Sequence, residues 1–297
     1  MYLNYISSML KPVFYIIILS LGISFAQNSS NEKQPNQIKL IISLNSFHNA
    51  KTEDAQAIAE ILANHIKKLH NLNYQFEVKT PVSMEEIENA FGTDFDCSIL
   101  TTEEFLSLQN KLPLEPINTN YTNGNIGYKY LLLVNKDVNI TDIKQLKNES
   151  INILARETQK APFLWVEKLL RENGLKDYKK FFKSVSVDYK ATNVVLPVFF
   201  GKIKACIVTE SSYNLLCELN PSIKSKLKVL QSTDNILLGM VCLNKNKKDK
   251  SSYSLLKEIF PTLQVNEYGK QLLYLFSADK LVPYKNEYLQ NYLKLLK

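Results

Sequence analysis

Glycine and histidine are scarce in this chain, whose 297 residues include eight glycines and three histidines. So few glycines leave little material for phosphate-cradling loops, and neither a Walker A motif nor a dinucleotide-binding glycine pattern occurs. No HExxH or GxSxG motif is present either, and the histidines, His48, His65 and His70, all fall in one early stretch. The sequence therefore lacks the known motifs of nucleotide-binding proteins, metalloproteases and hydrolases, and we expect no cofactor and no metal.

The four cysteines, Cys97, Cys206, Cys217 and Cys242, are far apart, and none belongs to a CxxC pair. This spacing argues against a zinc site. Three of them lie in apolar segments, where a free cysteine behaves as a small buried hydrophobic residue. Only Cys206 and Cys217 are close in sequence, and export from the cytoplasm permits a disulfide between them. The sequence leaves this bridge open.

Basic residues are numerous but dispersed, and they give a formal net charge of +7. Lysines are scattered among asparagine, isoleucine and tyrosine, and only Lys245 to Lys250 forms a cluster. No basic stripe with interleaved aromatic residues occurs, so we expect no nucleic-acid partner. Most of the lysines are interpreted as solvated surface. A weak attraction for anionic ligands or for an anionic membrane is the functional alternative.

The amino-terminal segment has the pattern of a secretory signal peptide. An uncharged apolar run, Val13 to Phe25, follows Lys11 and ends next to the small residue Ala26. We expect cleavage near Ala26 and a location outside the cytoplasm, periplasmic or secreted. The run is shorter than the roughly 20 residues of a transmembrane helix, so an uncleaved anchor is the alternative. No cysteine lies near the cleavage position, which argues against a lipid anchor, and both Met1 and Met9 remain possible starts.

Short apolar runs alternate with amphipathic stretches along the rest of the chain. Strands that alternate with helices predict an α/β fold with mostly parallel sheets. The predicted strands are Ile38 to Leu44, Tyr74 to Lys79, Cys97 to Leu100, Tyr128 to Val134, Ile151 to Ala155, Lys204 to Thr209, Leu227 to Leu230 and Leu238 to Leu243.

The predicted helices have recognisable starts. The segment Glu53 to Leu69 repeats apolar residues at three- and four-residue spacing, as one face of a helix does. Ser83 with Glu86 and Thr101 with Glu104 have the spacing of capping boxes, in which a hydroxyl and a carboxylate bond to unpaired amides at a helix start.

Two later helices should end on glycine and pack into a core. Gly174 and Gly201 follow helical stretches, where a left-handed cap is favourable. Trp165 and Leu169 are four residues apart and share a helix face. Together with Phe199, which belongs to an apolar run before Gly201, they are predicted to lie in the core of the second half of the protein.

Polar residues that follow the predicted strands are the candidate ligand-binding residues. In open α/β sheets, ligands bind outside the carboxyl ends of the strands, where helices begin and their free amides point outward. Each candidate can also be an ordinary N-cap, which is the alternative. The candidates are Asn45, Ser46, Thr101, Thr102, Thr158, Gln159, Lys160, Lys190, Thr209 and Ser211.

Seven segments, taken in their order along the chain, carry a resemblance to known proteins. They are Asp54-Ala55, Gly127 to Tyr130, Ile140 to Lys147, Phe163 to Gly174, Val195 to Lys202, Glu218 to Pro221 and Tyr268 to Pro283. In order and spacing they resemble one family, the phosphate, phosphite and phosphonate group of ABC-transporter substrate-binding proteins, with the type II periplasmic-binding-protein fold. The resemblance covers nearly all of the chain after the signal peptide.

This resemblance implies two lobes that close on a phosphate- or phosphonate-like small molecule, with an ABC permease in the membrane as partner and a monomeric state. The lobes would be joined by crossing strands near Tyr128 to Val134 and Leu238 to Leu243, which act as a hinge. The implied division of the chain is a signal peptide at 1–26, a polar linker at 27–37, lobe 1 at 38–130, lobe 2 at 131–242, and a return to lobe 1 with carboxyl-terminal helices at 243–297.

Two other functional classes stay open. A protein of the same fold can sense a ligand for a membrane receptor. The fold can also carry an enzyme, for which a nucleophilic pair of Cys97 and His48 is the only candidate chemistry. The expected role is non-catalytic.

Overall fold

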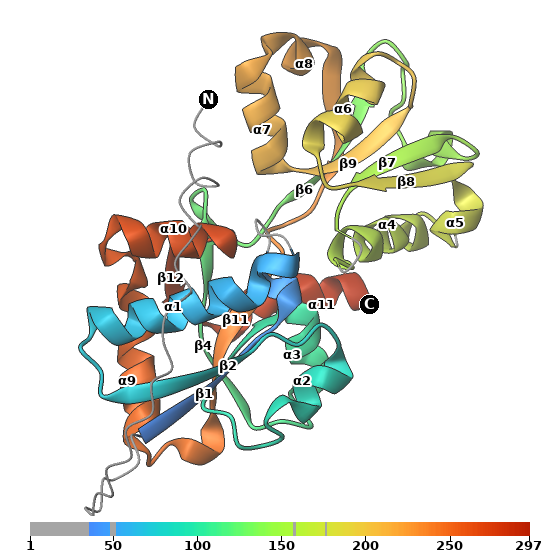
Figure 1. Ribbon diagram of the computed structural model, residues 1–297. Helices are drawn as coiled ribbons and strands as arrows, with labels where there is room; N and C mark the ends of the chain where they lie inside the picture. Colours follow the sequence, from blue (N-terminus) through green and yellow to red (C-terminus); the bar gives the residue numbers. More distant parts are fainter. Residues whose placement is uncertain (1–35, 48–51, 157–158, 176) are drawn as a thin grey trace, which may run out of the picture. The chain divides into compact units, whose positions relative to one another are not determined.

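The computed structural model describes residues 36–47, 52–156, 159–175 and 177–297, and it contains two β-sheets flanked by helices (Figure 1). The predicted signal peptide, His48 and Thr158 lie outside the described residues. Among the helices of the described residues, none combines the length and the apolar character that a bilayer crossing requires.

The first sheet has the strand order β12-β4-β11-β3-β1-β2, with β5 paired to β4. Along β1, alternate side chains face opposite sides, as the two-residue period of a strand requires. Ile38, Leu40 and Ile42 pack with α1, α9 and α10, whereas Ile41 packs with α2 and α3. The strands are β1 (Asn36–Ile42), β2 (Tyr74–Lys79), β3 (Cys97–Thr101), β4 (Leu114–Thr122), β5 (Asn125–Ile126), β11 (Gly239–Asn244) and β12 (Lys280–Pro283).

The second sheet has the order β10-β6-β9-β7-β8. One face packs against α6, α7 and α8 through Leu131, Leu133 and Val208, and the other packs against α4 through Ile151 and Ile153. Both faces are covered, and the strands β6 and β9 are buried along their whole length. They are β6 (Tyr130–Asn135), β7 (Ser150–Leu154), β8 (Ser184–Asp188), β9 (Ala205–Thr209) and β10 (Leu227–Ser232).

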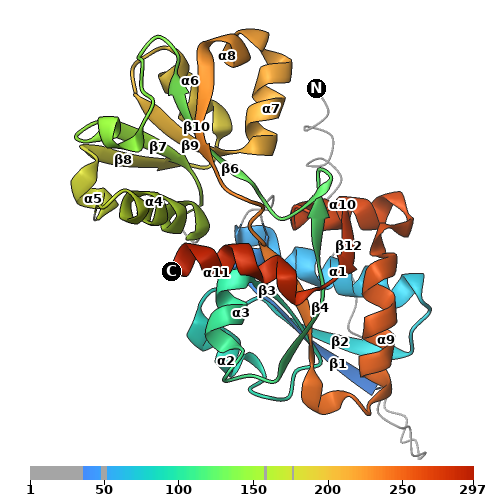
Figure 2. The same ribbon diagram turned by 180° about the vertical axis from the view of Figure 1, so that it is seen from behind.

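The helices alternate with the strands, as the sequence pattern predicted (Figures 1 and 2). They are α1 (Ala55–Leu69), α2 (Met84–Ala90), α3 (Thr102–Leu108), α4 (Ala161–Glu172), α5 (Tyr178–Phe181), α6 (Ala191–Phe199), α7 (Glu210–Leu219), α8 (Pro221–Lys226), α9 (Ser251–Ile259), α10 (Glu267–Leu275) and α11 (Gln290–Leu296). Short 3-10 turns occupy Leu44–Ser46, Thr52–Asp54, Ile143–Leu146, Lys245–Lys247, Phe260–Val265 and Asn286–Leu289.

The α/β class is confirmed, but the sheets are mixed and not mostly parallel. Parallel pairing is confined to β1 with β2 and β3, and to β7 with β8 and β9. The strands β4, β11, β6 and β10 run antiparallel to their neighbours. The reason is topological: the chain crosses between the sheets through these strands, and they enter each sheet against the direction of the parallel strands.

Two segments connect the sheets, residues 127–129 on the way out and 233–238 on the way back. Tyr128 and Ile236 form an antiparallel bridge between them, with N···O distances of 2.9 and 2.7 Å. β11 pairs with β3 and β4, so the chain has returned to the first sheet by Gly239, a few residues before the predicted return at residue 243. The final helix α11 packs against α4, which covers the second sheet (Figure 2).

The predicted helix ends and core residues can be compared directly. Gly174 and Gly201 both have φ +72° and end their helices, as expected. Trp165 and Leu169 are 3% and 8% exposed and belong to the core. Phe199 is only partly buried, because it lies in the last turn of α6 with the Lys226 ammonium over its ring.

The cysteines are all free, so the bridge between Cys206 and Cys217 is not formed. Cys206 is fully buried in β9, whereas Cys217 lies on α7 and is only partly buried.

Candidate functional site

A polar cavity of about 270 Å³ lies at the carboxyl ends of β7, β8 and β9. These strands are neighbours, and their register pairs Ile153 with Ile207 and Leu154 with Asp188. Thr209 ends β9, and Ala155 and Tyr189 directly follow β7 and β8. By this register the three residues stand in one row across the sheet edge, and all three line the cavity. The further lining residues are Tyr128, Tyr130, Leu154, Arg156, Gln159, Ser211, Ser212 and Ser277.

Arg156 supplies a permanent positive charge to this cavity. It directly follows β7 and is half-buried, and it is one of only two arginines among 36 basic residues. Its backbone N–H donates to Gln159 Oε1 at 3.1 Å, which fixes the turn before α4. A guanidinium is always protonated and presents several donors, so it suits an oxyanion better than lysine does.

Tyr130 adds a buried hydroxyl to the same cavity. The residue is 3% exposed and its backbone N–H donates to Thr233 Oγ1 at 2.8 Å. Within the described residues, no hydrogen bond to its hydroxyl is found, and the side chain lines this cavity and a smaller one beside it. Burial raises the pKa of Tyr130 far above its ordinary value. The hydroxyl therefore stays protonated and can donate to an anion.

Of the helix starts around this cavity and the smaller one, those of α3, α4 and α6 already hold a carboxylate from the protein. At α3, Glu104 accepts the Thr101 N–H at 2.8 Å and completes the predicted capping box. At α4, Glu103 accepts the Lys160 N–H at 2.8 Å. At α6, Asp188 accepts the Lys190 N–H at 2.7 Å. A carboxylate is favourable at the positive end of a helix dipole. It also offsets the positive potential there, so a bound anion would gain little from that helix start.

Among the described residues, the start of α7 is different, because its hydroxyl cap has no carboxylate bonded beside it. Thr209 Oγ1 accepts the Ser212 N–H at 3.2 Å, and Ser211 and Ser212 place further hydroxyls within 3.2 and 2.8 Å of Thr209. The one acidic residue of its first turn, Glu210, pairs with Lys129 at 3.0 Å. The positive end of α7 therefore faces the cavity with neutral side chains beside Arg156.

Three of the sequence-predicted residues, Gln159, Thr209 and Ser211, line this polar cavity. Lys190 lies next to it, with its ammonium 5.7 Å from the centre of the Tyr189 ring. The Lys160 ammonium is largely exposed and lies 4.0 Å from Glu103 Oε2.

A smaller cavity of about 30 Å³ contains another group of predicted residues, Asn45, Thr101, Thr102 and Gln159. Their side chains have partners within the protein. Asn45 Nδ2 donates to Glu104 Oε1 at 2.9 Å, and Thr102 Oγ1 donates to the Leu237 carbonyl at 2.9 Å. Tyr130 and Gln159 line both cavities.

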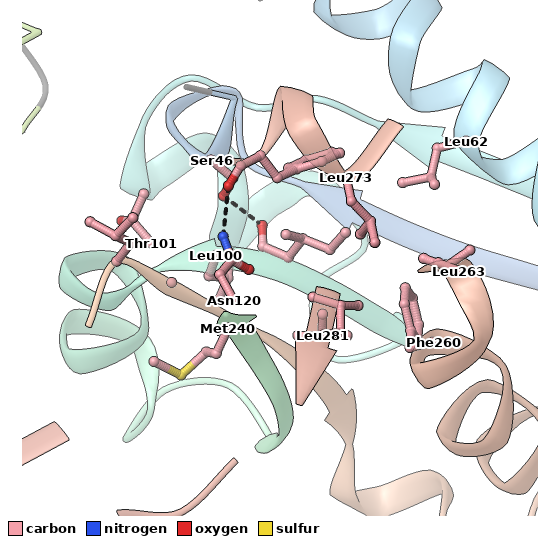
Figure 3. A pocket seen from close by; sticks show the side chains of 15 residues that line it. Ser46, Leu62, Leu100, Thr101, Asn120, Met240, Phe260, Leu263, Leu273 and Leu281 are labelled. Atoms are coloured by element: carbon pink, nitrogen blue, oxygen red, sulfur yellow. Dashed lines mark hydrogen bonds between the residues drawn. The ribbon is translucent and has the colours of Figure 1, made fainter. Parts of the chain in front are cut away.

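Ser46 lies apart from both cavities, in an apolar pocket of about 20 Å³ inside the first sheet's core (Figure 3). Its hydroxyl donates to the Ile99 carbonyl at 3.2 Å, and Asn120 Nδ2 donates to the Phe276 carbonyl at 2.7 Å. Leucine and phenylalanine side chains make up most of the remaining wall, including Leu273 and Phe260. With its hydroxyl already bonded to the backbone, Ser46 has a structural role here.

The candidate nucleophile Cys97 has the wrong environment for catalysis. It is fully buried, and burial raises its pKa well above the ordinary value, whereas a reactive cysteine needs a lowered pKa. Its proposed partner, His48, lies outside the described residues. Over the described part of the chain, no group of three or more His, Cys, Asp or Glu side chains could hold a metal ion.

The sequence reading missed Arg156 and the three tyrosines of the cavity, Tyr128, Tyr130 and Tyr189. The rarity of arginine, together with its place directly after a predicted strand, was an available signal for Arg156. Tyr128 and Tyr130 were assigned to a hinge strand, and Tyr189 follows a strand that was not predicted.

Comparisons with known proteins identify the family of the chain. The family model described as "ABC transporter, phosphonate, periplasmic substrate-binding protein" matches residues 47–289. No curated protein matches the chain.

Solved structures with a similar fold come from several bacteria. A binding protein component of an ABC phosphonate transporter from Pseudomonas aeruginosa has 17% identity and a TM-score of 0.56, with 89% of this chain and 86% of that chain covered. PhnD1 from Prochlorococcus marinus in complex with methylphosphonate has 15% identity and a TM-score of 0.58, with 88% and 97% covered. XAC2383 from Xanthomonas citri bound to ATP has 12% identity and a TM-score of 0.62, with 88% and 95% covered.

Proposed function

The chain belongs to the family of periplasmic substrate-binding proteins of phosphonate ABC transporters, and we propose that it captures a small oxyanion in the polar cavity over β7, β8 and β9. Proteins of this family bind a small ligand and work with a membrane permease. They are components of transporters and not an enzyme family.

One observation supports the anionic ligand most directly: the α7 start is capped by a hydroxyl and faces the same cavity as Arg156. The neighbouring helix starts, at α3, α4 and α6, already hold the carboxylates of Glu104, Glu103 and Asp188. An anion placed at α7 gains the helix dipole, the hydroxyl donors and the guanidinium together. Thr209, Ser211 and Gln159 are then ligand contacts, and Asn45, Thr101 and Thr102 are structural.

The proposed binding event is closure of two lobes about the crossing segments, with lobe 1 near residues 38–130 and 243–297 and lobe 2 between them. The Tyr128–Ile236 bridge joins the two crossing segments and is the natural pivot. Closure would bring the first-sheet side of the protein, including Ser277, over an anion held by Arg156. The closed form would be recognised by the ABC permease, and the protein would act as a monomer that releases its ligand unchanged.

The proposed location is the periplasm, after cleavage near Ala26. Mass spectrometry of the native protein should find an amino terminus near Gln27. An intact start at Met1 or Met9 in the cytoplasmic fraction would contradict export.

The two arginines provide a matched test of the anion site. We expect calorimetric titration with methylphosphonate and inorganic phosphate to show binding of at least one anion. Arg156→Gln should weaken that binding about tenfold or more, because a hydrogen bond to a charged group contributes about 1.5–3 kcal/mol. Arg171→Gln is the control, since Arg171 lies in α4 and its Nη2 donates to the Leu295 carbonyl at 3.5 Å. Equal affinity in both variants would contradict the site.

A further inference from the structure

The polar cavity is larger than a bare oxyanion requires. Its volume of about 270 Å³ is close to the lower end of the range for pockets that hold small organic ligands, roughly 300–1,000 Å³. Inorganic phosphate placed beside Arg156 and the α7 start would leave much of that volume filled by water.

One wall of the cavity is a row of three residues across the sheet edge, with Thr209 at one end and Tyr189 at the other. Thr209 is the last residue of β9, Ala155 follows β7 and Tyr189 follows β8, and the pairing register places the three at one level. The Ala155 N–H donates to the Asp188 carbonyl at 3.1 Å, which holds Tyr189 beside β7. Adjacent strands are about 4.8 Å apart, so the α7 start and Tyr189 are separated by two spacings, roughly 10 Å.

The two ends of this row differ in chemistry. The Thr209 end carries the hydroxyls, the α7 start and Arg156 next to it. The Tyr189 end carries an aromatic ring that is 69% exposed, next to a helix start already occupied by the Asp188 carboxylate. An anion is therefore favoured at the first end and disfavoured at the second. An exposed ring that lines a cavity is suited to stacking against a flat apolar group.

We infer that the ligand is an organic anion with a flat, apolar substituent, of the arylphosphonate class: its charged head lies at Arg156 and α7 and its ring lies against Tyr189. This inference rests on the proposed function, since the charged head uses the same site. The hydroxyl of Tyr130, a buried residue that lines the cavity, donates to the head group. Lys190, 5.7 Å from the Tyr189 ring centre, adds positive charge at that end without occupying the cavity wall.

Phenylphosphonate and methylphosphonate form the test pair, because they share the head group and differ in the substituent. Calorimetric titration of the mature protein should show phenylphosphonate binding about threefold to tenfold more tightly, the range expected for one aromatic pair. Tyr189→Ala should remove this advantage and leave methylphosphonate affinity within about twofold of the unmodified protein. Tyr189→Phe should retain it.

The control variant is Tyr268→Ala, which removes a half-exposed tyrosine on α10 that contacts His65 and not the cavity. It should leave both affinities unchanged. Methylphosphonate binding as tightly as phenylphosphonate, or an equal loss for both in Tyr189→Ala, would overturn the inference while the anion site stands. Failure of both phosphonates to bind, with no effect of Arg156→Gln, would overturn the proposed function as well.

Discussion

Glu103 Oε1 accepts the backbone N–H of Lys160 at 2.8 Å, so a carboxylate of the protein occupies the start of α4. The Tyr292 hydroxyl of α11 bonds to the same carboxylate. One glutamate on α3 thus ties together α3, α4 and the carboxyl-terminal helix. Because this position holds an internal anion, the proposed ligand anion is better placed at the α7 start, beside Arg156.

This arrangement predicts a pH dependence of stability. Burial raises the pKa of Glu103, although the hydrogen bonds from Tyr292 and Lys160 act in the opposite direction. The folded protein therefore holds this proton to a higher pH than the unfolded chain. The associated stability is present below the unfolded pKa and is lost as pH rises through the folded pKa. The free energy of unfolding, relative to Glu103→Gln, should fall as pH rises from the ordinary glutamate pKa, about 4.3, through the higher pKa of the folded state.

Glu85→Gln is the matched control, since Glu85 is exposed in the first turn of α2. Its pH profile should be parallel to that of the unmodified protein. A profile of Glu103→Gln that is parallel as well would show that the carboxylate is not perturbed by its surroundings.

The fold was largely predictable from local patterns, and the exceptions have identifiable causes. The eight predicted strands all exist, because each is either an apolar run or, as in Tyr74–Lys79, an alternation of apolar and polar residues. β4 (Leu114–Thr122) was missed because Pro116 and the polar residues Asn118 and Asn120 interrupt its apolar pattern. The antiparallel direction of the crossing strands could not be predicted from the sequence either, because strand direction depends on how distant segments pair and not on composition.

The candidate site was only partly predictable. The rule that ligands bind at strand ends pointed to the edge where Thr209 and Gln159 line a cavity, but it could not separate helix caps from proposed ligand contacts. Thr102 has the same sequence context as Ser211 and yet bonds to the Leu237 carbonyl. Only the spatial position of Glu103 and the other carboxylates distinguishes the helix starts.

The buried face of α4 provides a stability prediction. Leu169 is 8% exposed and packs in the core with Trp165, so Leu169→Ala should cost about 2–5 kcal/mol of unfolding free energy. Leu219→Ala is the control: Leu219 ends α7 and is 75% exposed, and a change there should stay within about 0.5 kcal/mol. Urea unfolding of both variants measures the difference. Similar losses would show that the packing of α4 is described wrongly.

Two threonines should separate binding from stability. Thr102→Ala removes the hydrogen bond to the Leu237 carbonyl, so we expect it to cost about 1–3 kcal/mol of stability and leave methylphosphonate affinity unchanged. Thr209→Ala removes the α7 cap, which costs about 1 kcal/mol, and also weakens methylphosphonate binding. Thr209→Ser keeps the hydroxyl and should preserve both. Calorimetric titration measures the affinity of each variant, and chemical unfolding measures its stability. Unchanged methylphosphonate affinity in Thr209→Ala would mean that Thr209 acts only as a helix cap.

The bridge between the crossing segments depends on a glycine. Gly127 has φ +77°, and a Cβ atom there would overlap the Ile236 carbonyl oxygen, which accepts the Tyr128 N–H. Gly124 has nearly the same backbone, φ +79°, but open space around it. Gly124→Ala should therefore lower the free energy of unfolding by about 1–2 kcal/mol, because alanine has to adopt the left-handed backbone conformation.

Gly127→Ala should cost that amount plus roughly 1–3 kcal/mol for the overlap, because the backbone of the other crossing segment has to move. Chemical unfolding of the two variants isolates the contact, since the backbone term is common to both. Equal losses of unfolding free energy in the two variants would mean that the two crossing segments can separate without a loss of stability. The Tyr128–Ile236 bridge would then be too weak to serve as the pivot of lobe closure.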